Sequence, residues 1–168
     1  MTCPGVQEGL GSAGVSIHSF LPYSTGKPNM GFISNWWKAL GYLSPSQQTW
    51  LVPYQKWERY FTNGQSQTVQ KRLYYDYVVP ASSKVMRDLM TASAKVHYRR
   101  PRPPLLILAG SQDRVSSPAS NYRSYTRYMT NHSITSYKEF EGFCHFPFGL
   151  PNWKLQADYV SSWLESFD

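Results

Sequence analysis

Two side chains that could share a proton follow the two clearest strand patterns of the sequence. Asp113 comes after the apolar run at 104–110, and His145 comes after the alternating run at 134–140. In open parallel sheets, chemistry collects at the carboxyl ends of the strands. An aspartate beside a histidine ring fixes the tautomer of the ring and stabilises the imidazolium formed when the histidine takes a proton from a nucleophile. The spacing therefore predicts the acid and the base of a nucleophile–histidine–acid triad.

Each of these signals has an ordinary explanation when it is taken alone. An aspartate in a turn usually closes an Asx-turn or caps a helix, and a histidine in a loop usually has no special role. The order of elements is more specific: strand, Gly-x-x-Asp, helix, strand, loop with His145, helix.

The elements that would position Asp113 and His145 fall into three zones. Residues 1–26 begin glycine-rich and then alternate like a short strand at 15–20. Residues 27–98 have helical spacing, and residues 99–168 alternate strand and helix. This alternation predicts an α/β fold, with a parallel sheet covered by helices. The helices are predicted at 50–61, 67–77, 83–94, 118–128 and 155–167, with a loop at 142–151. Pro53 limits where the helix at 50–61 can begin.

Three segments of the third zone resemble the C-terminal part of proteins with the α/β-hydrolase fold. PPLLILAGSQDRVSSP (103–118) resembles the strand and acid loop, with Asp113 at the acid position. SYKEFEGFCHFPFGLPNW (136–153) resembles the last strand and the histidine loop, with His145 at the histidine position, and ADYVSSWL (157–164) resembles the final helix.

Two earlier segments extend the resemblance. LYYDYVVPASSKVM (73–86) is similar to the helical cap of lipase- and esterase-like members, and SIHSFLPYSTG (16–26) is similar to the end of the sixth strand. The resemblance implies a partial α/β-hydrolase fold, with a parallel half-sheet of about three strands flanked by helices and a helical cap insertion. It divides the chain into a residual sixth-strand region (1–26), a helical cap (27–98) and a C-terminal core with the acid and histidine loops (99–168).

The nucleophile of that family is missing from the pattern. It sits in a Gly-x-Ser-x-Gly elbow before the sixth strand. The nearest string is Leu10-Gly11-Ser12-Ala13-Gly14, which has leucine where the first glycine belongs and leaves no room for the helix that follows an elbow. Ser12 is therefore disfavoured as nucleophile, and we expect the nucleophile, with the oxyanion-hole loop, to lie outside this chain.

The aromatic residues of the second zone have two interpretations. Trp36, Trp37, Tyr54 and Trp57 could pack a core, or they could line an apolar substrate pocket. Under the second interpretation, the resemblance implies a hydrolase whose substrate is a small apolar or aromatic ester-like molecule. It implies no cofactor and no metal, and His18, His97 and His132 show no metal-binding spacing.

Composition bounds the remaining possibilities. The chain of 168 residues has a formal net charge of +7, but the excess of basic residues is spread along it. The dense basic run Arg99, Arg100 and Arg102 is interpreted as a solvated linker, with a phosphate-binding patch as the alternative. No nucleic-acid partner is predicted. Two cysteines make no disulfide framework, and Cys144 is expected to be a buried apolar residue.

No apolar run is long enough for a membrane helix, and the first residues lack the pattern of a signal peptide. A cytoplasmic protein with no membrane span is therefore predicted.

Two functions remain open from the sequence. The first is the C-terminal part of a hydrolase in which Asp113 and His145 serve a nucleophile from outside the chain. The alternative is a non-catalytic remnant of the same fold that binds a ligand or a partner. By either reading the chain alone is expected to be inactive, and the uncovered edge of the half-sheet predicts self-association.

Overall fold

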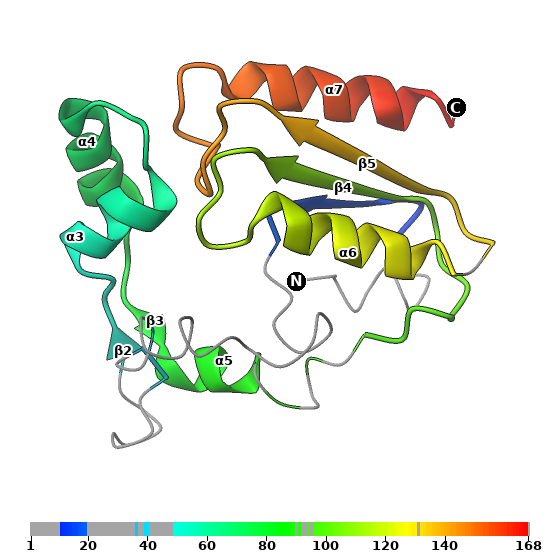
Figure 1. Cartoon of the computed structure of the whole chain (residues 1–168), viewed down its shortest axis with the longest axis horizontal. Coiled ribbons are helices and arrows are strands. Elements are labelled where there is room, and N and C mark those ends of the chain that lie inside the picture. Colours follow the sequence, from blue (N-terminus) through cyan, green and yellow to red (C-terminus); the bar gives the residue numbers. More distant parts are fainter. Residues whose placement is uncertain are drawn as a thin grey trace.

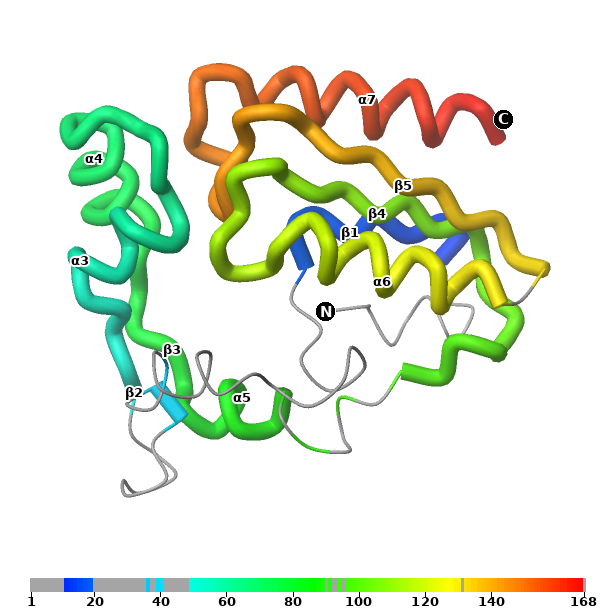
Figure 2. The backbone as a smooth tube through the Cα atoms, viewed as in Figure 1, coloured from blue at the N-terminus to red at the C-terminus, as the bar shows by residue number. Residues whose placement is uncertain are grey.

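The computed structural model describes residues 11–19, 36, 39–40, 49–89, 91, 94, 96–130 and 132–167. Its central feature is a parallel sheet with the strand order β1-β4-β5 (Figures 1 and 2). The strands are β1 (Gly14–Ile17), β4 (Leu105–Gly110) and β5 (Thr135–Phe140). β1 pairs with β4 from Gly14 opposite Leu105, and β4 pairs with β5 from Leu105 opposite Thr135. The predicted three-stranded parallel half-sheet is confirmed.

Helices α6 (Pro118–Tyr128) and α7 (Trp153–Glu165) cover opposite faces of this sheet (Figure 1). The alternation of side chains along a strand sorts the contacts. Tyr137 packs with Tyr125 on the α6 side. Its neighbour Ser136 accepts a hydrogen bond from Trp163 of α7 at 3.0 Å. All six residues of β4 are buried, as its continuous apolar run predicts for a strand covered on both faces.

Arg102 corrects the interpretation of the basic run as a solvated linker. This residue is only 9% exposed. Its guanidinium donates to the carbonyl oxygens of Pro103 and Ile134 at 3.0 Å each and to the hydroxyl of Thr135, and it lies 4.8 Å from the ring centroid of Tyr128. Arginine can satisfy several carbonyl groups at once because its guanidinium holds five N–H donors in one plane. Arg102 therefore ties the start of β4 to the start of β5, whereas Arg99 and Arg100 are exposed.

Residues 49–89, called the helical segment below, lie beside the sheet (Figure 1). Two short strands of this segment, β2 (Thr49–Trp50) and β3 (Ala81–Ser82), pair in an antiparallel sheet that the sequence did not predict. The other elements are α3 (Tyr54–Lys56), the π-helix η1 (Trp57–Phe61), α4 (Gln67–Tyr77) and α5 (Ser83–Asp88).

Local signals explain where these helices start. The Ser66 side chain accepts from the N–H of Val69 and caps α4, and Ser82 caps α5 through the N–H of Lys84. The predicted helix at 67–77 is confirmed. Within the predicted helix at 50–61, helical structure starts only after Pro53, the residue expected to limit it, because proline has no N–H to give to a helix interior. The predicted helix at 83–94 ends early, at Asp88.

Candidate active site

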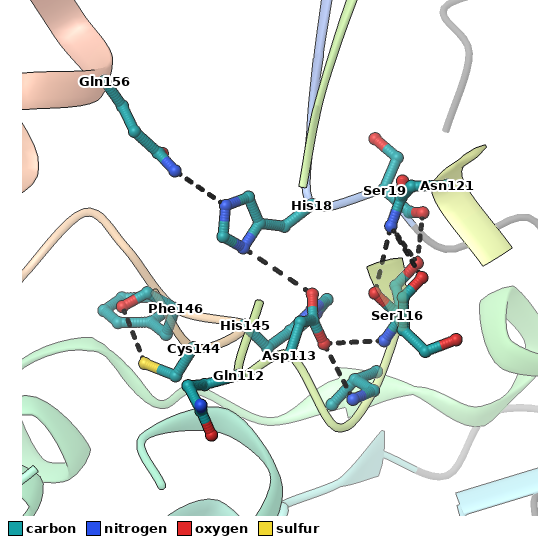
Figure 3. Close-up of polar contacts among 12 residues, drawn as sticks. His18, Ser19, Gln112, Asp113, Ser116, Asn121, Cys144, His145, Phe146 and Gln156 are labelled. Atoms are coloured by element: carbon teal, nitrogen blue, oxygen red, sulfur yellow. Dashed lines mark hydrogen bonds and ion pairs between the residues drawn. The ribbon is translucent and has the colours of Figure 1, made fainter. Parts of the chain in front are cut away.

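Asp113 lies in the tight turn after β4, with its side chain 0% exposed. One carboxylate oxygen, Oδ1, accepts the backbone N–H of Val115 at 2.8 Å and of Ser116 at 2.7 Å. Figure 3 shows the bond from Ser116 to Asp113. This is the Asx-turn expected of an aspartate in a loop, but it engages only one of the two oxygens. The second oxygen, Oδ2, is left for other partners.

That second oxygen meets His145. The Nδ1 atom of His145 is 2.9 Å from Asp113 Oδ2, and the His145 side chain is 18% exposed. A carboxylate can only accept, so Nδ1 carries the hydrogen and Nε2 carries the lone pair of the neutral ring. The two residues singled out in the sequence are thus brought into contact, in the arrangement that prepares a histidine to take a proton at Nε2.

Backbone contacts hold the acid loop against the histidine loop. Ser111 N–H donates to the carbonyl of Phe140 at 2.9 Å, and Gln112 N–H donates to the carbonyl of Phe143 at 3.0 Å. Gly110 permits this approach, because a Cβ at this position would lie 2.3 Å from the Phe143 oxygen. The separation between Asp113 and His145 is therefore fixed by the last residues of two hydrogen-bonded parallel strands.

A polar network supports the other side of the acid loop. The buried side chain of Asn121, on α6, donates to the carbonyl and to the hydroxyl of Ser116 at 3.0 Å each. The Ser116 hydroxyl in turn donates to the carbonyl of Ser19 at 2.6 Å. Through this network, Asn121 of α6 and Ser19, which follows β1, hold the loop whose N–H groups bind Asp113 (Figure 3).

The π-helix of the helical segment reaches the histidine loop. The ring centroids of Phe61 and His145 are 5.2 Å apart in an edge-to-face arrangement, and Phe146 N–H donates to the Phe61 carbonyl at 3.0 Å. Two residues further on, the Asn63 amide donates to the Gln112 carbonyl at 2.8 Å. One short segment therefore touches both loops. π-Helical turns are rare and occur often at functional sites.

The four predicted pocket residues divide as follows. Trp36 and Trp57 are 5% and 4% exposed and belong to a core cluster that includes Phe143 and Leu150 of the histidine loop. Trp57 stacks on Phe61 at 5.3 Å and donates its indole N–H to Gln70. Tyr54 is half-buried against the same cluster. Trp37 lies outside the described residues. Whether these residues also line a substrate pocket stays a prediction.

Ser12 does not lie with this site. It precedes the amino end of β1, whereas Asp113 and His145 follow the carboxyl ends of the neighbouring strands. Four strand residues span roughly 13 Å at about 3.3 Å each. The length of β1 therefore separates Ser12 from the end of the sheet where Asp113 and His145 lie. Within the described part of the chain, no hydroxyl or thiol hydrogen bonds to His145.

Cys144 also offers no nucleophile. Its side chain is fully buried, as the sequence predicted, and burial raises the pKa of its thiol. A buried thiol that resists ionisation is a poor nucleophile because the thiolate is the reactive form.

Sequence reasoning missed His18, which lies against Asp113. The Nδ1 atom of His18 is 3.6 Å from Asp113 Oδ2, and its Nε2 is 2.8 Å from the amide nitrogen of Gln156. The signal that could have found it is the one that found Asp113 and His145. His18 lies in the strand predicted at 15–20, and because β1 ends at Ile17, His18 belongs to the same edge of the sheet.

Other features of the described residues lie elsewhere or are absent. An open recess of about 630 Å³ is lined by residues 96–101, Arg127 and Thr130, before β4 and at the end of α6, away from Asp113 and His145. The described residues contain no group of three or more His, Cys, Asp or Glu side chains placed to hold a metal ion. None of the helices described is long and apolar enough to cross a membrane.

No protein-family model matches the sequence, and no curated protein is significantly similar to it. Among solved structures, the chain is similar to the monoacylglycerol lipase of Paleococcus ferrophilus, with a TM-score of 0.63 and 22% sequence identity. The match covers 94% of this chain and 60% of that one, so the chain spans about three fifths of the length of the lipase. At this identity the likeness shows the fold. Together with the parallel sheet, it establishes that the chain has a partial α/β-hydrolase fold.

Proposed function

We propose that this chain supplies the acid, the histidine and the cap of a hydrolase that cleaves small apolar or aromatic esters, with a nucleophile from outside the chain. The observation that carries the proposal is the contact between Asp113 Oδ2 and His145 Nδ1 at 2.9 Å, with Oδ1 already held by two backbone N–H groups. The partial α/β-hydrolase fold supports it, because the carboxyl ends of the strands are where such folds place their chemistry.

In this mechanism Asp113 holds the ring and His145 moves the proton. As a hydroxyl oxygen of the nucleophile attacks the ester carbon, His145 Nε2 takes the hydroxyl proton, and Asp113 stabilises the imidazolium. The tetrahedral intermediate collapses, the C–O bond to the alcohol breaks, and the alcohol leaves with that proton. Water then attacks the acyl group, Nε2 takes a proton from it, and the carboxylic acid is released with the nucleophile restored.

The preference for an apolar substrate rests on the aromatic side chains around His145. Phe61 contacts the His145 ring directly, and Phe146, the next residue after His145, packs on Trp57 at 5.0 Å and on Tyr77 at 5.7 Å. Aromatic side chains bury large apolar areas and exclude water. We assign the helical segment the role of a cap because its π-helix carries Phe61 onto the histidine.

The experiment begins with the coding sequence directly upstream of the codon for Met1. An in-frame Gly-x-Ser-x-Gly would supply the missing nucleophile, and the longer protein would then be assayed with 4-nitrophenyl esters of increasing acyl length. We expect Asp113→Asn to lower kcat by about 10⁴-fold, the size seen when a triad histidine loses its orienting charge. The matched control is Asp158→Asn, because Asp158 is an exposed aspartate on α7 that pairs with Lys154.

Two results would overturn the proposal. One is an Asp113→Asn or His145→Ala protein with an unchanged rate. The other is an upstream sequence that contains no elbow, in which case a ligand- or partner-binding remnant replaces catalysis. The chain by itself is expected to hydrolyse the esters no faster than its His145→Ala variant, since it holds no nucleophile in contact with His145 among the residues described.

A further inference from the structure

His18 is a buried imidazole beside the candidate site that the mechanism above does not use. Its side chain is 1% exposed, and its backbone N–H continues the pairing of β1 by donating to the Leu108 carbonyl at 2.9 Å. Its φ of +47° lies in the left-handed region, which is strained for a residue other than glycine. Such strain persists where the surroundings over-determine the conformation, and it gathers at functional sites.

The contacts of the ring define which nitrogen carries its proton. The amide nitrogen of Gln156 lies 2.8 Å from His18 Nε2. An amide nitrogen can only donate, so Nε2 accepts and the hydrogen of the neutral ring is on Nδ1. The opposite tautomer would turn the lone pair of Nδ1 toward the carboxylate of Asp113. Asp113 and Gln156 thus favour the same tautomer from opposite sides of the ring (Figure 3).

The carboxylate of Asp113 needs such donors because it is buried. An unpaired carboxylate taken out of water is strongly destabilised. The described residues place no lysine or arginine in an ion pair with it; its partners are two backbone N–H groups on Oδ1 and the rings of His145 and His18 on Oδ2. At 3.6 Å the His18 contact is longer than a hydrogen bond, so His18 acts on Oδ2 through the electrostatic attraction of its N–H dipole.

Gln156 supplies independent support from the C-terminal helix. It is the buried residue of α7, at 4% exposure, while Leu155 beside it is 59% exposed. An apolar side chain would be the ordinary choice for the buried position of a helix on a sheet. The hydrogen bond to His18 explains why the polar side chain of Gln156 occupies this buried position.

We propose that His18 is a positioning residue of this site: its neutral ring, kept as the Nδ1–H tautomer by Gln156, presents a second N–H to Asp113 Oδ2 and so fixes the carboxylate that orients His145. The kinetic consequence rests on the proposed hydrolase function. The effect on the Asp113–His145 contact does not, because the contact exists in this chain.

The electrostatics of the pocket agree with a neutral ring. Burial lowers the pKa of His18 to about 4 from its usual 6.5, against the opposing attraction of Asp113. His145 lowers it further, and the backbone of Cys144 raises it slightly. These groups and Gln156 face the ring from the turn after β4, from the histidine loop and from α7. His18 therefore stays uncharged at neutral pH and acts as a fixed dipole, not as a second base.

The first experiment needs no variant. The chain is labelled with ¹⁵N, and the ring nitrogens of its histidines are followed by long-range ¹H–¹⁵N NMR from pH 8 to pH 5. We expect His18 to remain neutral throughout, with its proton on Nδ1. A proton on Nε2, or a doubly protonated ring at pH 7, would overturn the proposal.

The second experiment measures how fast the Nδ1 proton of His145 exchanges with water. In His18→Gly, which also relieves the strain at positive φ, we expect exchange to be about tenfold faster. This is the low end of the effect of a lost hydrogen-bond donor to a charged group, because at 3.6 Å the His18 N–H dipole attracts Oδ2 less than a hydrogen bond would. In His18→Asn the rate should return to within about threefold, because asparagine tolerates this backbone region and keeps an N–H donor near Nδ1. His132→Asn, at an exposed histidine, is the matched control.

An unchanged exchange rate in His18→Gly contradicts the proposal, and so does an asparagine variant as fast as the glycine variant, since that would assign His18 a packing role only. In the nucleophile-bearing protein, His18→Gly should lower kcat with KM unchanged, and His18→Asn should restore it. If that protein hydrolyses no ester while the NMR results hold, the proposed function fails and the positioning role of His18 stands.

Discussion

Gly110→Ala should damage both the stability of the chain and the geometry of the candidate site. Gly110 ends β4, and a Cβ added there would lie 2.3 Å from the Phe143 oxygen and 2.6 Å from His18 Cε1. Contacts of Cβ below 3.0 Å essentially never occur. The Phe143 carbonyl would have to retreat by at least about 0.7 Å, the difference between those distances, and the His18 ring by about 0.4 Å.

The cost of this movement can be worked out from the contacts that would be lost. The Phe143 carbonyl accepts the N–H of Gln112 at 3.0 Å, so a retreat of that size breaks the bond, at about 1 kcal/mol. Overpacking a buried position adds about 1–3 kcal/mol. We therefore expect Gly110→Ala to lower the free energy of unfolding by about 2–4 kcal/mol, and Tm by about 4–16 °C at the usual ratio for a chain of this size.

Urea unfolding followed by tryptophan fluorescence measures the change. Gly11→Ala is the matched control, because a Cβ at the exposed Gly11 would meet only the Ala13 oxygen, at an ordinary 3.7 Å. That variant should stay within about 0.5 kcal/mol of the wild type. If Gly110→Ala is equally stable, the close approach of the two loops at Gly110 is wrong, and with it the argument that the strand ends fix the separation of Asp113 and His145.

Three further predictions concern pH, Arg102 and self-association. Because the pKa of His18 falls from 6.5 to about 4 on folding, the unfolded chain binds a proton in this window that the folded chain excludes. The free energy of unfolding should therefore fall by about 3 kcal/mol between pH 6.5 and pH 4 from this group alone, and urea titrations of His18→Asn should lack that part of the slope. Arg102→Met removes the hydrogen bonds from the guanidinium to the carbonyls of Pro103 and Ile134, so it should cost about 2–4 kcal/mol in the same assay. The exposed Arg123→Met should cost under about 0.5 kcal/mol; equal effects would contradict the structural role of Arg102. Sedimentation velocity over a hundredfold range of concentration should show dimers or larger species, since β1 is an edge strand of the three-stranded sheet, and a monomer at every concentration would refute this.

Local sequence determined the elements that carry their own signals. The helix at 118–128 begins with the Ser117 cap and Pro118, and the helix at 67–77 begins with the Ser66 cap. The start of each helix could therefore be read directly from the sequence. β4 is an uninterrupted apolar run between prolines and a glycine turn. Asp113 and His145 could be found in the same way, because the carboxyl end of a parallel strand is defined by the order of elements along the chain.

Tertiary structure decided the features that depend on residues distant in the chain. The β2–β3 pair joins Thr49 to Ser82, and neither two-residue strand has a pattern of its own to reveal it. Arg102 sits in a basic, proline-rich run typical of a solvated linker, and it is buried because the starts of β4 and β5 bring carbonyl acceptors around it. The residues of the helix predicted at 50–61 form the end of β2, the short α3 and the π-helix η1, which places Phe61 against His145.

His18 shows the division most clearly. The sequence predicted a strand at 15–20 that contains it, but its chemistry depends on Asp113 and Gln156, which lie far from it along the chain. Its ring stays neutral because it is buried among those partners, which lowers its pKa. Periodicity and capping are properties of neighbouring residues, whereas the charge state and the orientation of a buried side chain are set by whatever the fold packs around it.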